Sequence, residues 1–520
     1  MKLLKAIATI SSLTLLSRIA GFGRDMLTAI VMGAGPVSDA FFVALKLPNL
    51  FRRITAEGAF SAAFVPLFSG KLEKDGRDQA IAFARDVQAM MLAILVPFCI
   101  LVVAAMPWVL HVIAPGFVDD PVRFDLAVEL SRITFPYIVL ISLTALLGGV
   151  MNALDRFAPF AAMPIFFNLS LVSALIYVAL GGEVETPAHA LVWAVIGAGV
   201  FQLLWMVYHC LRVKVFVGAA TPKMTKDIRK TFKLMGPGLI GAGVAQINIF
   251  IDMILASLLP AGAISFLYYA DRLYQFPLGM IGLSVGVALL PMLARKIKAK
   301  DYEKGRLLFT QAFAAGWALA IPSAVGLVVL AEPILSALFE YGAFTAEDAA
   351  MSAKALRAYA LALPAFIMIR ILSSASFAAE DTKTPVRYAI IGSVVNIVFS
   401  ILLLKPLGHV GIALATAGGS WVNVLLLARA LTKKNKVIVW EKEQVKQLLS
   451  ILFCATVMAV TLILLRNIDS SRLFSATPTG KVAYMFSLVG LGGLSYFVTI
   501  FFTGNVRYFK LIFQSTKSAA

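Results

Sequence analysis

Apolar residues in this chain of 520 residues fall into long runs separated by short polar or Gly/Pro-rich breaks. Runs such as Met90–Leu110, Ile133–Val150 and Met485–Phe502 are each long enough to cross about 30 Å of hydrocarbon as a helix. We therefore expect an all-α polytopic membrane protein with about 14 transmembrane helices. The expected spans are residues 5–32, 37–69, 86–110, 125–153, 158–180, 189–210, 232–258, 264–293, 307–335, 350–377, 385–404, 409–428, 447–465 and 482–503.

Composition supports this fold class. Hydrophobic residues make up 60% of the chain and charged residues only 14%, whereas soluble domains are roughly 45–50% apolar and about 25% charged. A soluble enzyme, a secreted disulfide scaffold and a disordered chain are therefore excluded. The cysteines, Cys99, Cys210 and Cys454, lie in or beside apolar runs without ligand spacing, so we interpret them as packing residues. No small-residue cleavage site follows Met1–Leu16, which predicts a retained first span.

The net charge of +18 would suggest nucleic-acid binding in a soluble protein, but here it follows the membrane topology. Alternate loops carry 24 of the 46 basic residues, and several opposite loops are acidic. The basic loops are 70–86, 154–157, 211–231, 294–306, 378–384 and 429–446. We therefore expect these loops and both chain ends on the cytoplasmic side of the membrane, and no nucleic-acid partner.

Two halves of the chain resemble each other at an offset of 225–229 residues. An even number of spans separates the copies, so both have the same orientation. We expect two parallel six-helix lobes, 1–218 and 219–440, around a central cavity, followed by two additional helices in 441–520. The matching positions are Phe64–Lys71 with Leu289–Lys296, Gly76-Arg77 with Gly305-Arg306, Phe135-Pro136 with Leu363-Pro364, and Asn168 with Asn396.

Ionisable residues within the apolar segments are the candidate functional groups, because each costs at least about 2.5–3.5 kcal/mol at the bilayer centre. The first span contains Arg18, Arg24 and Asp25. Ser17, Gly21 and Arg24 share one helix face, and Arg18 shares the adjacent face with Asp25. Three interpretations are possible for these arginines: they line a cavity, they pair with Asp25 without a further role, or they extend to the membrane interface.

The second expected span, Val37–Ser69, is too long for one straight crossing, and its proline predicts a bent or broken helix. Irregular backbone in a membrane must be buried or line a wet cavity. Arg52 is the favoured cavity residue, while an interfacial anchor is an equal alternative for Lys46 and Arg53. The polar and helix-breaking residues are Asp39, Lys46, Pro48, Asn49, Arg52, Arg53, Glu57 and Gly58.

In the second lobe, Tyr268, Arg272 and Gln275 form a polar stripe beside Asp271. Arginines from both lobes with few compensating acids predict an anionic ligand, with phosphate or pyrophosphate first, because guanidinium binds these groups in a bidentate manner. A cationic-drug exporter would need acidic cavities. A non-transporting scaffold would not need intramembrane arginines.

Signs of catalysis are missing from the sequence. Gly21-Phe-Gly23 is not a phosphate-binding loop, and the four histidines, His111, His189, His209 and His409, show no paired metal spacing. We therefore expect a transporter rather than an enzyme, driven by an ion gradient, the membrane potential or the substrate gradient.

Several segments are similar to the MurJ (MviN) family of lipid II flippases. They are Ser17–Asp25, Asp39–Arg53, Ala56–Pro66, Ala114–Phe117, Thr134–Tyr137 and Tyr268–Leu273. The resemblance implies a fold of the multidrug/oligosaccharidyl-lipid/polysaccharide exporter type. It also implies transport of lipid II, the undecaprenyl-pyrophosphate-linked disaccharide-pentapeptide, from the cytoplasmic to the periplasmic leaflet of a bacterial inner membrane for peptidoglycan synthesis. From the two lobes we expect alternating access by rocking about the central cavity. Another polyprenyl-pyrophosphate-linked oligosaccharide is the alternative cargo.

The resemblance also implies residue roles. Arg24, Arg52 and Arg272 would contact the pyrophosphate, while Arg18, Asp25 and Asp39 would shape the same cavity. The two C-terminal spans would form a groove for the lipid tail. Membrane lipids are expected partners, and other cell-envelope synthesis proteins are candidate partners.

A sodium site of some family members implies Na+ as a candidate coupling ion. That site would fall on Asp252, Asn396, Ser400 and Thr416, with the carbonyl of Ile412. Ser400 stands where those members have an acid, so one carboxylate is missing. A buried Asp252 that is simply hydrogen-bonded to its neighbours is the alternative.

Overall fold

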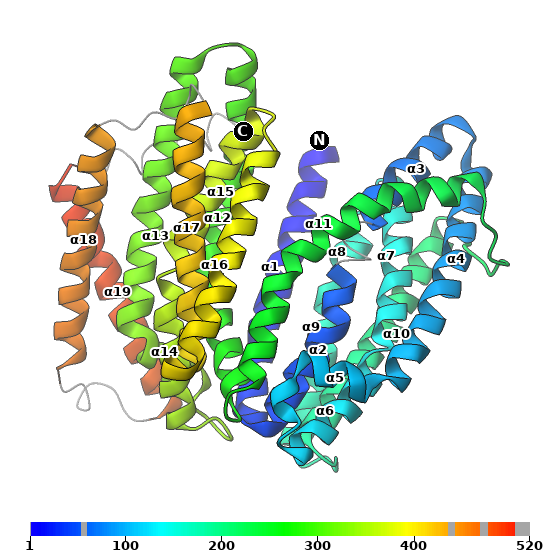
Figure 1. The fold of residues 1–520 in the computed structure, drawn as a ribbon, viewed down its shortest axis with the longest axis horizontal. Coiled ribbons are helices and arrows are strands. Elements are labelled where there is room, and N and C mark those ends of the chain that lie inside the picture. The colour runs from blue at the N-terminus through cyan, green and yellow to red at the C-terminus, as the bar shows by residue number, and fades with distance from the viewer. Residues whose placement is uncertain (1, 54–59, 435–441, 469–476, 505–520) are drawn as a thin grey trace. The chain divides into compact units, whose positions relative to one another are not determined.

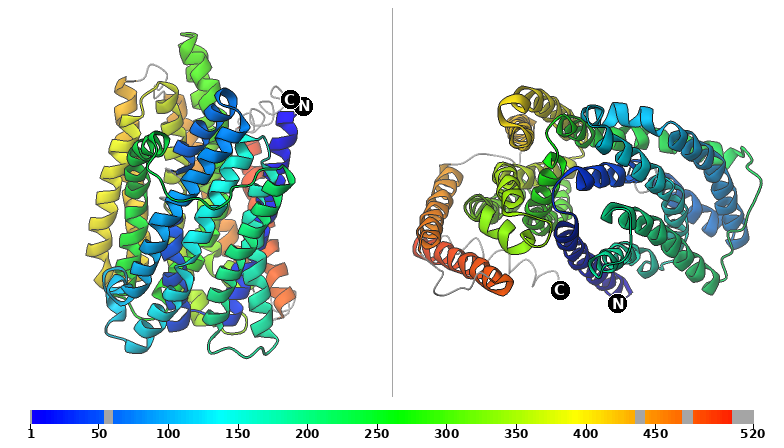
Figure 2. Two further views of the ribbon diagram at one scale, coloured as in Figure 1. Left: turned by 90° about the vertical axis from the view of Figure 1, so that its right-hand side faces the viewer. Right: turned by 90° about the horizontal axis from the view of Figure 1, so that it is seen from below.

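The computed structural model describes residues 2–53, 60–434, 442–468 and 477–504 (Figure 1). Those residues contain helices and no strand. Contacts divide the chain into two compact units. The first unit comprises Met1–Ser265 with Tyr341–Phe344, and the second comprises Phe266–Glu340 with Thr345–Ala520. Within each unit the long helices run roughly along a common direction (Figure 2).

In the first unit, helix α1 packs against α9, α2 against α6, and α10 against both α7 and α9. Its core contains a row of phenylalanines, Phe60, Phe64 and Phe68, one turn apart on one face, with Phe83 stacked on Phe64. The elements are α1 (Lys2–Met32), α2 (Pro36–Arg52), α3 (Ser61–Lys74), α4 (Arg77–Ala104), α5 (Met106–Ile113), η2 (Pro115–Phe117), α6 (Pro121–Thr134), α7 (Tyr137–Ala153), α8 (Ala158–Ala161), α9 (Met163–Ala179), α10 (Pro187–Arg212) and α11 (Lys226–Ser257).

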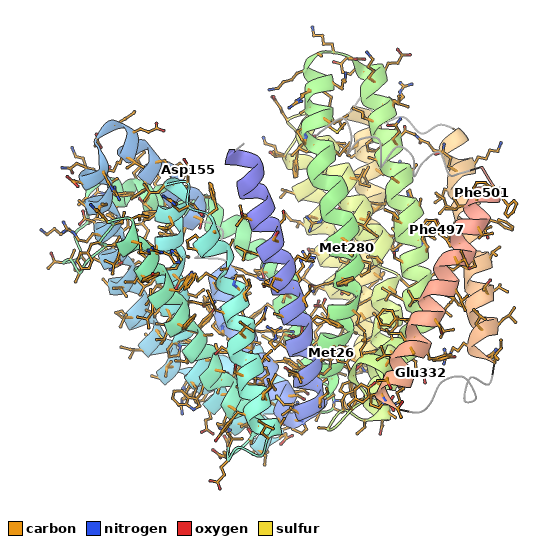
Figure 3. All side chains as sticks on the ribbon, turned by 180° about the vertical axis from the view of Figure 1, so that it is seen from behind. Met26, Asp155, Met280, Glu332, Phe497 and Phe501 are labelled. Atoms are coloured by element: carbon orange, nitrogen blue, oxygen red, sulfur yellow. The ribbon has the colours of Figure 1, made fainter. Side chains whose placement is uncertain are left out.

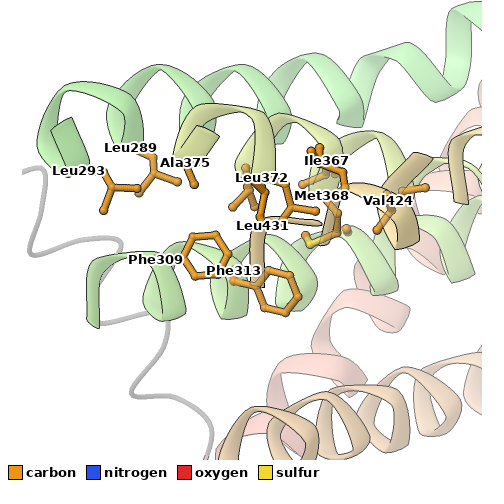
Figure 4. Close-up of a cluster of buried hydrophobic side chains, with 14 of the residues drawn as sticks. Leu289, Leu293, Phe309, Phe313, Ile367, Met368, Leu372, Ala375, Val424 and Leu431 are labelled. Carbon is orange, nitrogen blue, oxygen red and sulfur yellow. The ribbon is translucent and has the colours of Figure 1, made fainter. Parts of the chain in front are cut away.

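In the second unit, α16 and α17 pack closely, and α13 contacts both C-terminal helices. Leu289, Phe309, Met368 and Leu431 belong to a buried cluster that joins four helices (Figure 4). The elements are α12 (Ala263–Lys298, whose first residues belong to the first unit), α13 (Tyr302–Phe339), α14 (Ala346–Ala360), α15 (Leu363–Ala378), α16 (Lys383–Leu407), α17 (His409–Lys434), α18 (Lys442–Arg466) and α19 (Pro478–Phe502).

Ten helices or helix pairs among the described residues are long and apolar enough to cross a membrane. Helices α1, α11 and α12 are also long enough to cross a membrane, with 31, 32 and 36 residues. Large apolar side chains such as Phe497 and Phe501 are exposed on the outside of α19, as lipid contact requires (Figure 3). The chain is a multi-span membrane protein whose described residues form helices and no strand, which confirms the predicted fold class. The number of 14 spans stays a prediction.

The second expected span comprises two helices, α2 and α3, while Glu57 and Gly58 lie outside the described residues. Helix α11 contacts α3, α4 and α5 of the first unit, although it lies in the predicted lobe 219–440. The boundaries after residues 218 and 440 follow the sequence duplication, which contacts do not test, so they stay a prediction.

Candidate functional site

Arg24 is part of a hydrogen-bond network between α1 and α9. Its Nε and Nη2 donate to Oδ1 of Asp25 at 3.1 and 2.6 Å, and its Nη1 donates to Oδ1 of Asn168 at 2.9 Å. The Asn168 amide in turn donates to the Ser17 carbonyl at 3.0 Å. The side chains of Arg24 and Asp25 are only 11% and 5% exposed. The Arg–Asp pair considered above is therefore present, and a neighbouring helix orients the guanidinium.

Gly21 allows this close approach of α1 and α9. A Cβ atom at position 21 would lie 3.3 Å from the Asn168 amide nitrogen, which is tighter than ordinary van der Waals contact. Arg18 lies on α1 nearly two turns before Arg24 and is exposed. The structure therefore brings Gly21 and Arg24 to Asn168, with Asp25 paired to Arg24, whereas Arg18 is exposed. A role of Arg18 in a substrate cavity stays a prediction.

The second candidate arginine lies at the end of α2, beside a proline irregularity. Pro48 has no N–H to offer the Ala44 carbonyl. The buried Thr134 hydroxyl on α6 lies 3.2 Å from that carbonyl oxygen and 2.8 Å from the Leu130 carbonyl, so its single proton can serve either one. Asn49 accepts a 3.2 Å hydrogen bond from Arg52 Nε. The polar residues around the proline thus stabilise the local backbone and orient Arg52.

Arg52 is half-buried, whereas its neighbour Arg53 is exposed. This difference in burial agrees with Arg52 as the favoured residue. The structure does not test which of the two arginines contacts a substrate.

Asp39 acts as a cap for the start of α12. Its Oδ2 accepts a hydrogen bond from the Gly262 backbone N–H at 2.7 Å, and its Oδ1 accepts from the Ser265 N–H and hydroxyl at 2.9 and 2.6 Å. The first N–H groups of a helix have no partner within the helix, and a carboxylate satisfies them well. Asp39 is 1% exposed. These contacts give it a structural role, and a role toward a substrate stays a prediction.

Arg123, which sequence reasoning missed, performs the complementary task at the end of α11. Its Nη2 donates to the Ser257 carbonyl at 3.0 Å, its Nη1 lies 3.8 Å from Asp39 Oδ2, and its guanidinium lies 3.9 Å from the Phe117 ring centroid. Gly116 is required beside it, because a Cβ there would lie 2.1 Å from the Ser257 carbonyl oxygen. The segment Ala114–Phe117 and an arginine two residues before the fourth expected span, 125–153, were the available signals.

In the second unit, Arg272 contacts residues of its own helix. Its guanidinium lies 4.7 Å from the centre of the Tyr268 ring, and its Nη2 lies 3.8 Å from Asp271 Oδ2. Gln275 donates to the same Asp271 oxygen. The predicted polar stripe is therefore present. Arg272 belongs to the second unit, while Arg24 and Arg52 belong to the first, so their joint cavity stays a prediction.

The candidate sodium ligands also belong to different units. In the second unit, the Ser400 hydroxyl donates to Oδ1 of Asn396 at 3.3 Å, and the Thr416 hydroxyl donates to the Ile412 carbonyl at 3.1 Å. These oxygens are of the kind that hard cations prefer. Asp252 lies on α11 in the first unit. The sodium site stays a prediction.

Comparisons with known proteins decide the family. A model of the family described as "Lipid II flippase MurJ" matches residues 28–479. The chain belongs to the lipid II flippase MurJ family. A "Probable lipid II flippase MurJ" of Rhizobium tropici is 39% identical over 469 residues, which is 90% of this chain and 88% of the relative. The "Lipid II flippase MurJ" of Burkholderia cenocepacia is 36% identical over 439 residues, 84% of this chain and 85% of the relative.

Solved structures agree with this assignment. "Lipid II flippase MurJ, inward closed conformation" is 27% identical, with a TM-score of 0.78, and the match covers 97% of this chain and 99% of that chain. An inward-facing MATE family transporter of the MOP superfamily matches with a TM-score of 0.65 over 83% of this chain and 99% of that chain. At 13% identity, the second match shows the fold alone. The family and the exporter fold predicted from the sequence are both confirmed.

Proposed function

We propose that this MurJ-family protein moves lipid II from the cytoplasmic to the periplasmic leaflet of the bacterial inner membrane by alternating access. The observation that carries the proposal is the family match over residues 28–479, together with relatives that are named lipid II flippases across most of their length. The shared fold with transporters of the MOP superfamily supports alternating access. The protein acts as a transporter and not as an enzyme on the lipid.

The intramembrane arginines are the groups that bind the pyrophosphate in this proposal. Guanidinium is planar and stays charged at all physiological pH values, and it can donate two parallel hydrogen bonds to a phosphate. Asn168 and Asp25 orient Arg24, and Asn49 orients Arg52, so less conformational freedom is lost when an anion binds. Arg272 contributes from the second unit. The lipid tail stays in the bilayer, guided by the C-terminal helices.

The proposal also covers the orientation of the chain in the membrane and the energy source of transport. The basic loops place both chain ends in the cytoplasm by the positive-inside rule. Membrane potential or an ion gradient drives the cycle, with Na+ as the candidate coupling ion. Removal of Na+ at constant potential tests this part separately, because flipping that continues unchanged would exclude sodium coupling and leave the cargo assignment intact.

Depletion of the protein, followed by measurement of lipid II in each leaflet, tests the cargo. We expect lipid II to accumulate in the inner leaflet. Unchanged outer-leaflet lipid II would overturn the flippase proposal, and accumulation of a different polyprenyl-pyrophosphate-linked oligosaccharide would identify the alternative cargo.

Complementation with single variants then tests the arginines. We expect Arg24→Ala, Arg52→Ala or Arg272→Ala to reduce cell survival and flipping. The matched control is Arg229→Ala, an exposed arginine near the start of α11. Normal flipping in all three single variants, at normal protein levels, would refute the arginine contacts.

A further inference from the structure

A cluster of two carboxylates and one imidazole lies in the first unit, at the N-terminal end of α10. Glu129 lies on α6, Glu185 lies just before α10, and His189 lies in the first turn of α10. Nε2 of His189 is 3.5 Å from Oε1 of Glu129 and 3.7 Å from Oε2 of Glu185. One ligand atom from each residue lies within 4.8 Å of the other two. Helices α6 and α10 pack together, so their contact fixes the cluster.

His189 is held as a metal-binding histidine would be. The residue is only 8% exposed, and within the described part of the chain its Nε2 has no hydrogen-bond partner, although it points at the two carboxylates. Its other ring nitrogen, Nδ1, lies 2.9 Å from the Thr186 hydroxyl. Ligating histidines usually use the second ring nitrogen for such an outer contact, which fixes the ring and the tautomer. With the proton on Nδ1, the Nε2 lone pair faces the carboxylates.

We propose that Glu129, Glu185 and His189 bind a divalent transition-metal ion of the zinc class. Zinc binds imidazole nitrogen and carboxylate oxygen at about 2.0–2.2 Å, so two ligands of a tetrahedral site lie roughly 3.4 Å apart. The distances of 3.5 and 3.7 Å around Nε2 are close to this separation. Two carboxylates balance the charge of the ion, and a fourth position stays open for water. Imidazole in the set disfavours Mg²⁺ and Ca²⁺, which prefer oxygen ligands alone.

Such an ion would tie α6 to the start of α10. Glu129 and Glu185 are exposed, with side chains 53% and 74% accessible, so the ion can enter from the aqueous side without unfolding. By the charge rule that places the basic loops in the cytoplasm, this end faces the periplasm. The competing arrangement of the same side chains is a protonated His189 that forms an ion pair with the carboxylates and binds no metal.

Zinc titration of the full chain distinguishes the two arrangements. The protein is purified in detergent, treated with EDTA, dialysed, and titrated with ZnCl2 by calorimetry, with a thermal unfolding series in parallel. We expect one saturable site and a rise in Tm of about 3 °C at saturation. MgCl2 at the same concentration should produce neither effect. Failure of the EDTA-treated protein to bind Zn²⁺ would support the simple ion pair and overturn the proposal.

Variants assign the ligands. His189→Gln and Glu129→Gln should each raise the Kd for Zn²⁺ by about tenfold or more. Glu185→Gln should do the same, and because Glu185 is an exposed loop residue its variant should fold even if the other two do not. The matched controls are His111→Gln and Glu183→Gln, which remove an exposed histidine and an exposed acid outside the cluster. Equal zinc binding by controls and cluster variants would show adventitious binding and overturn the site, whatever the protein transports.

Discussion

Asn168 and Asn396 occupy equivalent positions of the internal repeat but have different partners. Both are buried, at 6% and 4% exposure. Asn168 reaches another helix, where it accepts from Arg24 and donates to the Ser17 carbonyl. Asn396 accepts from Ser400, one turn along its own helix. Both positions of the sequence repeat thus carry a buried amide, and among the described residues the one in the first unit orients an arginine. Asn168 therefore orients the candidate substrate contact Arg24, whereas the hydrogen-bond partner of Asn396 is Ser400.

Among the variants that test this difference, removal of Arg24 should lower the free energy of unfolding most. Arg24→Ala takes away an ion pair at 2.6 Å from a carboxylate that is 5% exposed, and a hydrogen bond to Asn168. We expect the free energy of unfolding to fall by about 3 kcal/mol, the range for breaking a buried ion pair. Thermal unfolding in detergent measures this change. Arg229→Ala is the control, and an equal Tm for both variants would contradict a tightly held Arg24.

A glycine packs against each asparagine, and here the larger loss of stability should fall in the second unit, at Gly419 beside Asn396. A Cβ on Gly419 of α17 would lie 2.5 Å from the Gly392 carbonyl oxygen and 2.9 Å from the Asn396 Cβ, whereas one on Gly21 would meet only the Asn168 side chain, at 3.3 Å. We expect Gly419→Ala to cost about 2–3 kcal/mol, because backbone must move, and Gly21→Ala about 1 kcal/mol or less. Unfolding curves of the two variants test this order. A larger loss for Gly21→Ala would refute the packing argument.

The asparagines themselves should follow with smaller effects. Asn168→Ala removes three hydrogen bonds between helices, one of them a long 3.4 Å contact with the Ser17 hydroxyl, so we expect a loss of about 2 kcal/mol. Asn396→Ala removes one bond within a helix, about 1 kcal/mol. Asn168→Ala should also reduce flipping, because the Arg24 guanidinium loses its orienting partner. Flipping and Tm measured on both variants separate orientation from stability. Normal flipping by Asn168→Ala would mean that the amide only stabilises the fold.

How far the sequence predicted these features depends on the distance between partners. Apolar runs predicted the positions of the long helices, and the contact of Tyr268 with Arg272 followed from a spacing of four residues. The bond from Arg24 to Asn168 joins positions 144 residues apart, and that from Arg123 to Ser257 joins positions 134 apart. No periodicity within one helix can reveal such contacts. The proline at position 48 predicted an irregular helix, but not that Thr134 of another helix lies beside the released carbonyl.

The repeat also matches Lys71 with Lys296, and this pair gives the smallest predicted effect. Lys71 pairs with Asp227 at the start of α11 at 2.9 Å, whereas Lys296 pairs with the nearby Asp301 at 3.6 Å. The hydrogen bond from Lys71 to Asp227 raises the pKa of Lys71 above 10.5, although partial burial opposes the shift. A raised lysine pKa means that the stabilisation is complete below the unfolded value and is lost as the pH rises through the folded value.

We therefore expect Asp227→Asn to lower stability by about 0.5 kcal/mol at pH 8, as for other partly exposed ion pairs, and this deficit to shrink as the pH rises through the raised pKa of Lys71. Tm of wild type and variant at pH 8 and across a series of alkaline pH values measures this. The Asp301 pair should behave differently. Although slight burial opposes the shift, hydrogen bonds from Lys304 and the charges of Lys304 and Lys296 lower the pKa of Asp301, so its contribution is present above pH 3.8 and is lost in acid. An Asp227→Asn deficit that persists undiminished at high pH would show that the contact of α3 with α11 does not depend on the Lys71 charge.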